Sequence, residues 1–406
     1  MEAKVGRSQN RVRGFVSPEL DYQLLRALGV AAYGGSSVGE CMYATNGLAQ
    51  DEPAAWVARF SAMGRQAEAF GDAAVAARHT VSARDHYFRA ATYYRAAEYY
   101  ADPVAQSRGI GLRSREAFTK GAAHASWCVI EPVRIACEGG SMPGYFIKPD
   151  GGSTKRKTVI LISGSDGTSE EVFFSSGAGA VQRGYNALII DGPGQMGMYR
   201  DHPEVHFRPD YEVPLGLALD YAVGRPEVDS SRLALFGLSM GGYFVSRAAA
   251  FDNRVKALIP DSPLTDVSPL LAALLGDVAA KVGHDVRVED IDSLPDDVVP
   301  AFSKPPLKSH ALRFGARSAS SFIETAGKYV LDEAILKRIA CPCLVLGSAG
   351  EGALFAEQAD RFAATVSGAV TRHEFSAREG ADAHCQLGNP AASCAVAYDW
   401  LDERLA

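Results

Sequence analysis

Several features that would indicate other classes of protein are missing from this 406-residue sequence. No apolar run approaches the roughly 18 residues of a membrane span, and the N-terminal segment MEAKVGRSQNRVRGF lacks the apolar stretch of a signal peptide. We therefore expect a cytoplasmic protein that does not bind a membrane. Lys and Arg (41) are fewer than Asp and Glu (48), and no Lys/Arg-rich block occurs, so nucleic acid is not an expected partner.

Cysteines and glycine motifs give no sign of a metal or a cofactor. The seven cysteines are an odd number spread along the chain, unlike a secreted disulfide framework, so we expect reduced thiols. Cys341 and Cys343 begin an apparent buried strand without a second Cys/His pair at zinc-finger spacing, which favours core packing. No phosphate-binding or dinucleotide-binding glycine motif occurs. We therefore expect no metal, no cofactor and a small-molecule substrate as the partner, with a homodimer left open.

The first part of the chain has the apolar spacing of helices. Apolar residues recur every three and four positions in AAWVARFSAMGRQAEAF and ARDHYFRAATYYRAAEYYAD, which predicts an α-helical domain over 1–125. Its near-duplicated segment, RAATYY followed by RAAEYY, is too short to be a solenoid unit. This segment is either the packing face of one helix, the favoured interpretation, or an aromatic wall for a substrate.

The pattern changes near Trp127. Two apolar stretches joined at EGGSMP predict an antiparallel pair, and TVILISG, NALIIDG, LALFG, ALIPDS and CLVLGS predict buried parallel strands with helices between them. This alternation predicts an α/β fold over 126–406, with a doubly wound, mostly parallel sheet and ligands at the carboxyl ends of its strands. The segment 264–338 shows no obvious strand, which predicts an inserted lid.

The strongest chemical signal is the motif GLSMG at 237–241, between an apolar strand and a helix. This is a G-x-S-x-G nucleophile elbow in its required setting, and it predicts Ser239 as a nucleophile. A serine hydroxyl needs a base to attack a carbonyl. Of the four histidines after Ser239, His284 and His310 lie in the lid segment and His373 in the last strand. His384 lies in the loop before the C-terminal helix, where an α/β hydrolase places its base.

The acid that orients this histidine has three candidates. Its usual place is the loop after the penultimate strand, where Glu351 is the only carboxylate. Asp261 competes for this role from the end of the strand that follows the elbow helix, and it can instead bind substrate or cap the next turn. Asp382 is the third candidate.

The expected oxyanion hole combines two backbone N–H groups, that of Met240 and that of Ser165 in the loop after TVILI. Asp166, the next residue in that loop, either caps the helix beginning at residue 169 or faces the substrate. Phe173, together with Phe174 and the tyrosines of the helical domain, predicts a closed, mostly apolar pocket. Such a pocket favours a bulky, flat, weakly charged acyl compound over a peptide.

Several segments together resemble one branch of the α/β hydrolases. They are YYRAAEYY, EPVRIACEGGSMPGYFIKP, SGSDGTSEE, DGPGQ, RPEVDSSRLALFGLSMGGY and EGADAHCQLGNP. The branch contains fungal heptaketide-shortening hydrolases of melanin synthesis, 2,6-dihydroxypseudooxynicotine hydrolase, and esterase-like relatives of the fermentation-respiration switch protein. The resemblance implies an N-terminal helical domain over the active site and a Ser, Asp and His triad. Ser239 and His384 match this pattern, whereas Glu351 stands where an Asp is usual.

The resemblance also implies the kind of reaction. Members of the branch hydrolyse either a carbon–carbon bond next to a carbonyl or an ester, and a carbon leaving group departs only when its carbanion is delocalised, as in a β-diketone or an aryl ketone. We therefore expect a serine hydrolase acting on an aromatic or polyketide-like metabolite in secondary metabolism or catabolism. The alternative is a non-hydrolytic descendant, such as a cyclase, lyase or acyl transferase, that keeps the pocket.

Overall fold

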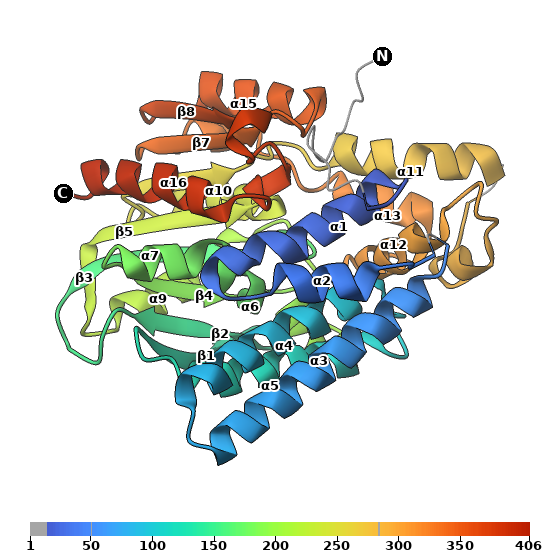
Figure 1. The fold of residues 1–406 in the computed structure, drawn as a ribbon. Coiled ribbons are helices and arrows are strands. Elements are labelled where there is room, and N and C mark those ends of the chain that lie inside the picture. The colour runs from blue at the N-terminus through green and yellow to red at the C-terminus, as the bar shows by residue number, and fades with distance from the viewer. Residues whose placement is uncertain (1–13, 50, 283–284) are drawn as a thin grey trace.

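The computed structural model describes residues 14–49, 51–282 and 285–406, which form an α/β hydrolase fold around one eight-stranded mixed sheet (Figure 1). The strands are β1 (Val129–Cys137), β2 (Gly140–Lys148), β3 (Arg156–Ile162), β4 (Asn186–Ile190), β5 (Val228–Leu238), β6 (Ala257–Asp261), β7 (Cys343–Ser348) and β8 (Val370–Phe375). Their order in the sheet is β1-β2-β4-β3-β5-β6-β7-β8. The strand β2 runs antiparallel to both of its neighbours, and the pairs from β4 to β8 are parallel. The predicted antiparallel pair and the predicted parallel strands are therefore confirmed.

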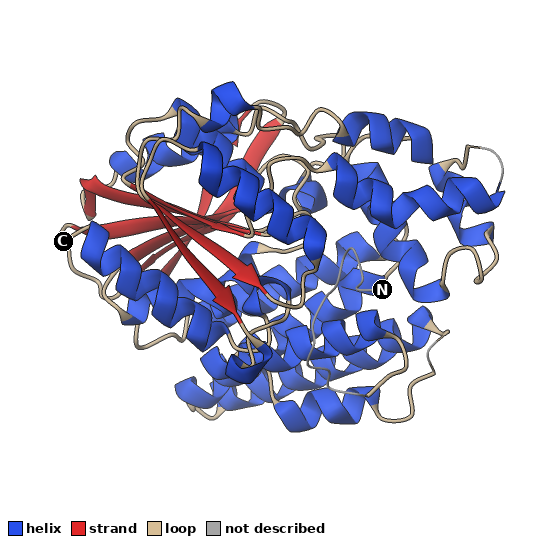
Figure 2. Ribbon diagram, turned by 90° about the horizontal axis from the view of Figure 1, so that it is seen from above, coloured by secondary structure: helices blue, strands red, loops and turns tan. Residues whose placement is uncertain are grey.

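Helices cover both faces of the sheet, as Figure 2 shows from above. Outside the segment between β6 and β7, the helices after β3 are α6 (Ser169–Val172), the π-turn η2 (Phe173–Gly177), α7 (Ala178–Gln182), α8 (Met196–Asp201), α9 (Glu212–Val223), α10 (Met240–Phe251), α15 (Ala353–Thr365) and α16 (Pro390–Arg404), with 3₁₀ turns η5 (Ala377–Glu379) and η6 (His384–Gln386). In β3, Val159 and Leu161 join the core on one face, whereas Ile160 and Ile162 join the core on the other. Both sets are fully buried because each face is covered, which explains the continuous apolar sequence of the strand.

The helices before β1 are α1 (Pro18–Gly29), the 3₁₀ turn η1 (Val30–Tyr33), α2 (Val38–Thr45), α3 (Pro53–Ala76), α4 (Thr80–Tyr100) and α5 (Ser107–Ala122). The aromatic run lies on α4 and packs between α3 and α5. The rings of Tyr94 and Tyr87 lie against Gly64 and Gly71 of α3, where any side chain would collide with them. Both rings are buried, and the hydroxyl of Tyr94 donates to Glu68 over 2.8 Å. The run is therefore the packing face of a helix, as favoured. The domain boundary near residue 125 stays a prediction.

The segment between β6 and β7 contains helices and no named strand among its described residues. These helices are α11 (Ser268–Val282), η3 (Val288–Ser293), η4 (Ala301–Ser303), α12 (Lys304–Arg313), α13 (Ala319–Ala326) and α14 (Glu333–Leu336). In Figure 1, α11, α12 and α13 gather at the right, beside the N-terminal helices. The role of this segment between β6 and β7 as a lid stays a prediction.

Within the described ranges, no helix is long and apolar enough to cross a membrane.

Candidate active site

Ser239 lies in a sharp turn between β5 and α10. Its backbone has φ 56° and ψ −124°, a left-handed conformation that costs energy for a non-glycine residue and that commonly marks functional sites. The turn depends on glycines on both sides. A β-carbon on Gly237 would strike the backbone of Gly241, and one on Gly241 would lie 2.8 Å from the carbonyl oxygen of Ser163. The predicted elbow therefore has the geometry that its motif requires.

A chain of hydrogen bonds links Ser239 to a buried acid. The Oγ of Ser239 lies 2.9 Å from Nε2 of His384, and Nδ1 of His384 lies 2.5 Å from Oε1 of Glu351. A carboxylate only accepts, so Nδ1 carries the proton and the Nε2 lone pair faces the serine hydroxyl. The imidazole is thus in the tautomer that can receive the proton of Ser239.

Glu351 is held in place by two serines. The hydroxyl of Ser262 donates to Glu351 with both carboxylate oxygens within 2.8 Å, and the backbone N–H of Ser348 donates to Oε2 over 2.9 Å. The carboxylate is almost completely buried, and these donors replace the water that it has lost. The side chain of Glu351, one of the three candidate acids, thus contacts His384 directly.

Asp261 lies close to this chain but takes a different position. It ends β6, and its backbone carbonyl accepts the N–H of Ser239 over 2.5 Å. Its side chain accepts from Gln386 Nε2 over 2.9 Å, while its Oδ2 is buried without a hydrogen-bond partner in the described part of the chain. Burial, followed by the charge of Glu351, raises the pKa of Asp261 to about 8. This shift favours the protonated form of Asp261, which lies next to the carboxyl group of Glu351. Asp382 contributes its carbonyl to the N–H of Gly350 over 3.0 Å.

The loop after β3 lies directly against the elbow. A β-carbon on Gly164 would lie 2.7 Å from Cβ of Ser239, so only glycine allows this close approach. The amide of Gln195 braces the loop from the DGPGQ segment, because its Nε2 donates to the carbonyls of Ser163 and Gly164 over 2.8 and 3.2 Å. This position is compatible with the oxyanion hole expected from the N–H groups of Met240 and Ser165, which stays a prediction.

Asp166 does not cap the helix that follows this loop. Thr168 is the N-cap residue, and its hydroxyl accepts the N–H of Glu171 over 3.3 Å. The carboxylate of Asp166 instead accepts from Nη1 of Arg26 over 2.8 Å. The spacing Thr168-x-x-Glu171 is a capping-box signature that could have identified the cap from the sequence.

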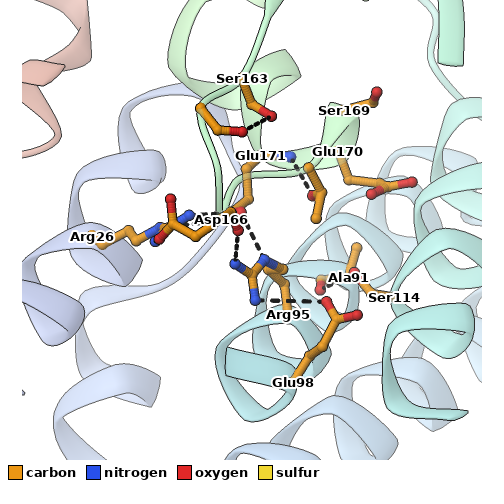
Figure 3. Close-up of polar contacts among 12 residues, drawn as sticks. Arg26, Ala91, Arg95, Glu98, Ser114, Ser163, Asp166, Ser169, Glu170 and Glu171 are labelled. Atoms are coloured by element: carbon orange, nitrogen blue, oxygen red, sulfur yellow. Dashed lines mark hydrogen bonds and ion pairs between the residues drawn. The ribbon is translucent and has the colours of Figure 1, made fainter. Parts of the chain in front are cut away.

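A network of arginines and carboxylates joins the N-terminal helices to this loop (Figure 3). Arg26 of α1 pairs with Asp166 and with Glu171 of α6, and Arg95 of α4 pairs with the same Glu171 over 2.7 Å. Arg95 also donates to the backbone carbonyl of Asp166. The helical region therefore fixes the position of the loop next to Ser239 through charge-assisted hydrogen bonds, which are stronger than neutral ones.

The expectation that Phe173 lines the substrate pocket finds no support in its surroundings. Phe173 is fully buried, and its ring packs against Phe118, Phe174 and Trp127 at centroid distances between 5.1 and 6.0 Å. These contacts belong to the core between the helical region and the sheet. A buried aromatic residue beside a predicted active-site loop has the same sequence signal whether it packs or binds, so the sequence could not separate the two roles.

A small cavity beside the β3 loop has a charged lining, and the apolar substrate pocket stays a prediction. This cavity measures about 10 Å³, and its lining includes Arg95, Asp166, His310 and Arg313. Nε2 of His310 lies 3.0 Å from the hydroxyl of Ser165. No local pattern near the β3 loop indicates these arginines, because they come from helices more than 70 residues away in either direction. His284 lies outside the described residues.

No family model matches the chain. It resembles a solved structure of 2,6-dihydroxy-pseudo-oxynicotine hydrolase with a TM-score of 0.69 and 19% identity, covering 93% of this chain and 96% of the other. This likeness shows the fold. The chain is also 28% identical to Hydrolase LUC6 of Fusarium sp, over 96% of this chain and 97% of the relative. With Hydrolase ORFZ of Pyricularia oryzae the identity is 30%, over 81% of each chain. The protein belongs to the α/β hydrolases, and the resemblance predicted from its motifs is confirmed.

Proposed function

We propose that this protein is a serine hydrolase in which Ser239, His384 and Glu351 act as a catalytic triad. The observation that carries the proposal is the continuous hydrogen-bonded chain from Ser239 Oγ through the imidazole to Glu351. A binding protein has no need of a base aligned on a strained serine. The fungal relatives named hydrolases support the same class of reaction.

The reaction begins at a substrate carbonyl. Ser239 Oγ bonds to the carbonyl carbon while its proton passes to Nε2 of His384, and the carbonyl oxygen becomes an oxyanion facing the N–H groups of Met240 and Ser165. The adduct collapses when the bond to the leaving group breaks, and His384 returns the proton to that group. Water then attacks the acyl-serine ester by the same steps in reverse and releases an acid. Glu351 stabilises the imidazolium that forms twice in this cycle.

The same sequence of steps serves esters and activated ketones. An alkoxide leaving group needs only the proton from His384, whereas a carbon leaving group must also delocalise its electron pair. We propose an aromatic or polyketide-like ester, β-diketone or aryl ketone of secondary metabolism as the substrate.

Labelling with a fluorophosphonate tests the nucleophile. We expect one adduct on Ser239 in the wild type and none in Ser239→Ala. Ser246→Ala is the matched control, because Ser246 lies on α10 and its buried hydroxyl donates to the Gly242 carbonyl over 2.6 Å. The control should label normally. Absence of labelling in the folded wild type would favour the non-hydrolytic alternative of a cyclase, lyase or acyl transferase.

A substrate screen tests the bond that is cleaved. β-Diketones, aryl ketones, short esters and aminoacyl anilides are offered side by side to the wild type and to Ser239→Ala. We expect turnover of esters or diketones that is lost in Ser239→Ala. A clear preference for the anilides would contradict the proposed substrate class.

A further inference from the structure

A cavity of about 320 Å³ lies where α5 meets the antiparallel strands β1 and β2 (Figure 1). It is far larger than the cavity of about 10 Å³ beside the β3 loop, and its volume is in the range of sites for small molecules. Its lining contains none of the three residues Ser239, His384 and Glu351. The cavity is therefore separate from the site that we assign to the hydrolytic reaction.

Asp191, which directly follows β4, lines this cavity and is only 1% exposed. One of its carboxyl oxygens is held by Ser169, whose backbone N–H and hydroxyl donate to Oδ2 over 3.0 and 2.8 Å. The other oxygen, Oδ1, is buried without a hydrogen-bond partner in the described part of the chain. An unpaired buried acceptor is costly, so a partner from outside the chain is expected at this atom.

The charged groups that line the cavity beside Asp191 are paired with other side chains. Glu170 accepts from the hydroxyl of Tyr145 over 2.9 Å and from Nη1 of Arg200 over 3.3 Å. Arg115 donates to both carboxylate oxygens of Asp201 over 3.0 and 2.8 Å. Among the described lining residues, Asp191 is thus the one that keeps an unpaired buried polar atom.

The ionisation of Asp191 narrows the kind of ligand. Burial, followed by the charge of Glu170, raises the pKa of Asp191 to about 7, so both of its forms occur near neutral pH. An ammonium group only donates and a carboxylate only accepts, whereas a hydroxyl does both and can pair with either form of Asp191. Pro132, Val133 and Pro143 add apolar surface to the lining, which suits a ring.

We propose that this cavity is a second small-molecule site, which binds a hydroxylated aromatic compound through a hydrogen bond between its hydroxyl and Asp191. The ring packs against the two prolines and Val133, and the hydroxyl meets the oxygen that the chain leaves unpaired. The inference goes beyond the proposed hydrolase function, because no triad residue takes part. Its test measures binding without turnover, so its outcome is independent of whether the protein is a hydrolase.

NMR titrations of the ligand signals with the wild-type protein compare resorcinol with 1,3-dimethoxybenzene, which keeps the ring and both oxygens but has no hydroxyl to donate. We expect resorcinol to bind about 10- to 100-fold more tightly, the range for a hydrogen bond to a charged acceptor. Benzylamine and benzoate are titrated as charged ligands, and both should bind more weakly than resorcinol. Tighter binding of either one would overturn the proposed ligand class.

Asp191→Asn decides whether the preference comes from this carboxyl group. The two donors of Ser169 hold the amide oxygen at the position of Oδ2, which leaves an N–H in place of Oδ1. A hydroxyl and an ether oxygen both accept from N–H, so the preference for resorcinol should fall to about threefold or less. Asp261→Asn is the matched control, because Asp261 is also a buried acid at a strand end with a raised pKa and an unpaired oxygen. It should keep the full preference.

Thr119→Trp is the second variant, and it decides the question should Asp191→Asn fail to fold. Thr119 lies on the exposed side of α5 at the cavity, and its hydroxyl contacts only the carbonyl of Arg115 in its own helix, over 2.9 Å. The indole should block the cavity and weaken resorcinol binding at least tenfold. Glu116→Trp is its control, since Glu116 lies on the same helix, is 64% exposed and is not part of the lining.

Three results would overturn the proposal. They are equal binding of resorcinol and its dimethyl ether to the wild type, a preference that persists in Asp191→Asn, and resorcinol binding that is unchanged in Thr119→Trp. The cavity would then hold water only, and Asp191 would be a structural residue of the loop after β4.

Discussion

Two aspartates flank Ser239, one on each side of the elbow, and their surroundings differ. On the β3 side, the partly exposed Asp166 lies among arginines from the N-terminal helices. On the β6 side, the buried Asp261 meets the amide of Gln386 and lies near a second acid. Burial raises the pKa of Asp166, but Arg26, followed by His310 and Arg95, outweighs burial and holds that pKa well below its usual range. The pKa of Asp261 moves in the opposite direction, to about 8.

This difference in pKa follows from where the fold places cationic side chains relative to the two aspartates. The helical region supplies cations to the β3 loop, so that loop can hold an anionic side chain. No cation lies within ion-pair distance of Asp261 among the described residues, and its raised pKa favours the neutral form of this acid near His384. A single charged acid is what the imidazole needs to hold one tautomer.

The largest expected effect is on catalysis, and it separates the roles of Glu351 and Asp261. Glu351→Gln should lower kcat/KM for an ester about 1,000- to 10,000-fold, because an amide does not stabilise the imidazolium. Asp261→Asn should cost only a few-fold, because Asn keeps the acceptor for Gln386 and resembles the protonated acid. Ester hydrolysis by both purified variants measures this difference. Equal losses would mean that Asp261 also acts on His384.

The next effect concerns the free energy of unfolding and the buried ion pair between Arg200 of α8 and Glu98 of α4. Arg200→Met leaves the buried Glu98 without its two hydrogen bonds and should lower the free energy of unfolding by about 3–5 kcal/mol. Arg247→Met is the matched control, because its ion pair with Glu212 lies nearer the surface, and it should cost about 1 kcal/mol or less. Urea unfolding of the three proteins at neutral pH gives both numbers. A loss for Arg200→Met no larger than the control would remove the distinction between the two ion pairs.

A pH series compares the two aspartates directly. The raised pKa of Asp261 means that the folded protein keeps a proton that the unfolded chain releases near pH 4, so wild-type stability falls as pH rises from about 4 to 8. Asp261→Asn removes this loss and should gain stability over the wild type across that window, by up to a few kcal/mol.

Asp166→Asn should behave in the opposite way. Its lowered pKa contributes stability above about pH 4 that is lost as pH falls, and the partly exposed side chain limits this contribution to about 1 kcal/mol. The variant should therefore be less stable than the wild type at neutral pH, with the difference closing in acid. Chemical unfolding at about pH 3, 5 and 8 covers both windows. Parallel curves for the two variants would contradict the assigned pKa directions.

The smallest effect concerns the cap of the helix after β3. Thr168→Ala should cost about 1 kcal/mol, the usual value for loss of an N-cap hydroxyl, and this cost should not change with pH. Thermal unfolding at two pH values checks it. A pH-dependent cost would indicate that the loss acts through Asp166 instead of the helix end.

The fold was largely predictable because its signals are local. Continuous apolar runs indicate the strands. The elbow motif indicates Ser239, and the loop before the C-terminal helix indicates His384; each of these signals is carried by a short stretch of sequence. Glu351 was favoured because it is the only carboxylate in its loop, and the structure brings it to His384. Its role in catalysis stays a prediction until the variants are measured.

The network around the β3 loop could not be read from the sequence. Arg26, Arg95 and Arg313 lie between 71 and 148 residues from the atoms that they contact in this loop. An arginine on an amphipathic helix has the same local pattern whether it points to solvent or to a distant carboxylate. The predicted apolar pocket stays a prediction, and the aromatic residues that suggested it pack against one another between the helical region and the sheet.

The ion pairs of Arg26 and Arg95 also limit how this protein can be recombined with its relatives. A chimera that exchanges the N-terminal helices would leave Asp166 and Glu171 facing whatever side chains the new helices carry. Such a chimera would keep these ion pairs only if both partners of each pair were exchanged together, although the partners are far apart in the sequence. In such an exchange the N-terminal helices and the β3 loop therefore have to be treated as one unit, although they are separated in the sequence.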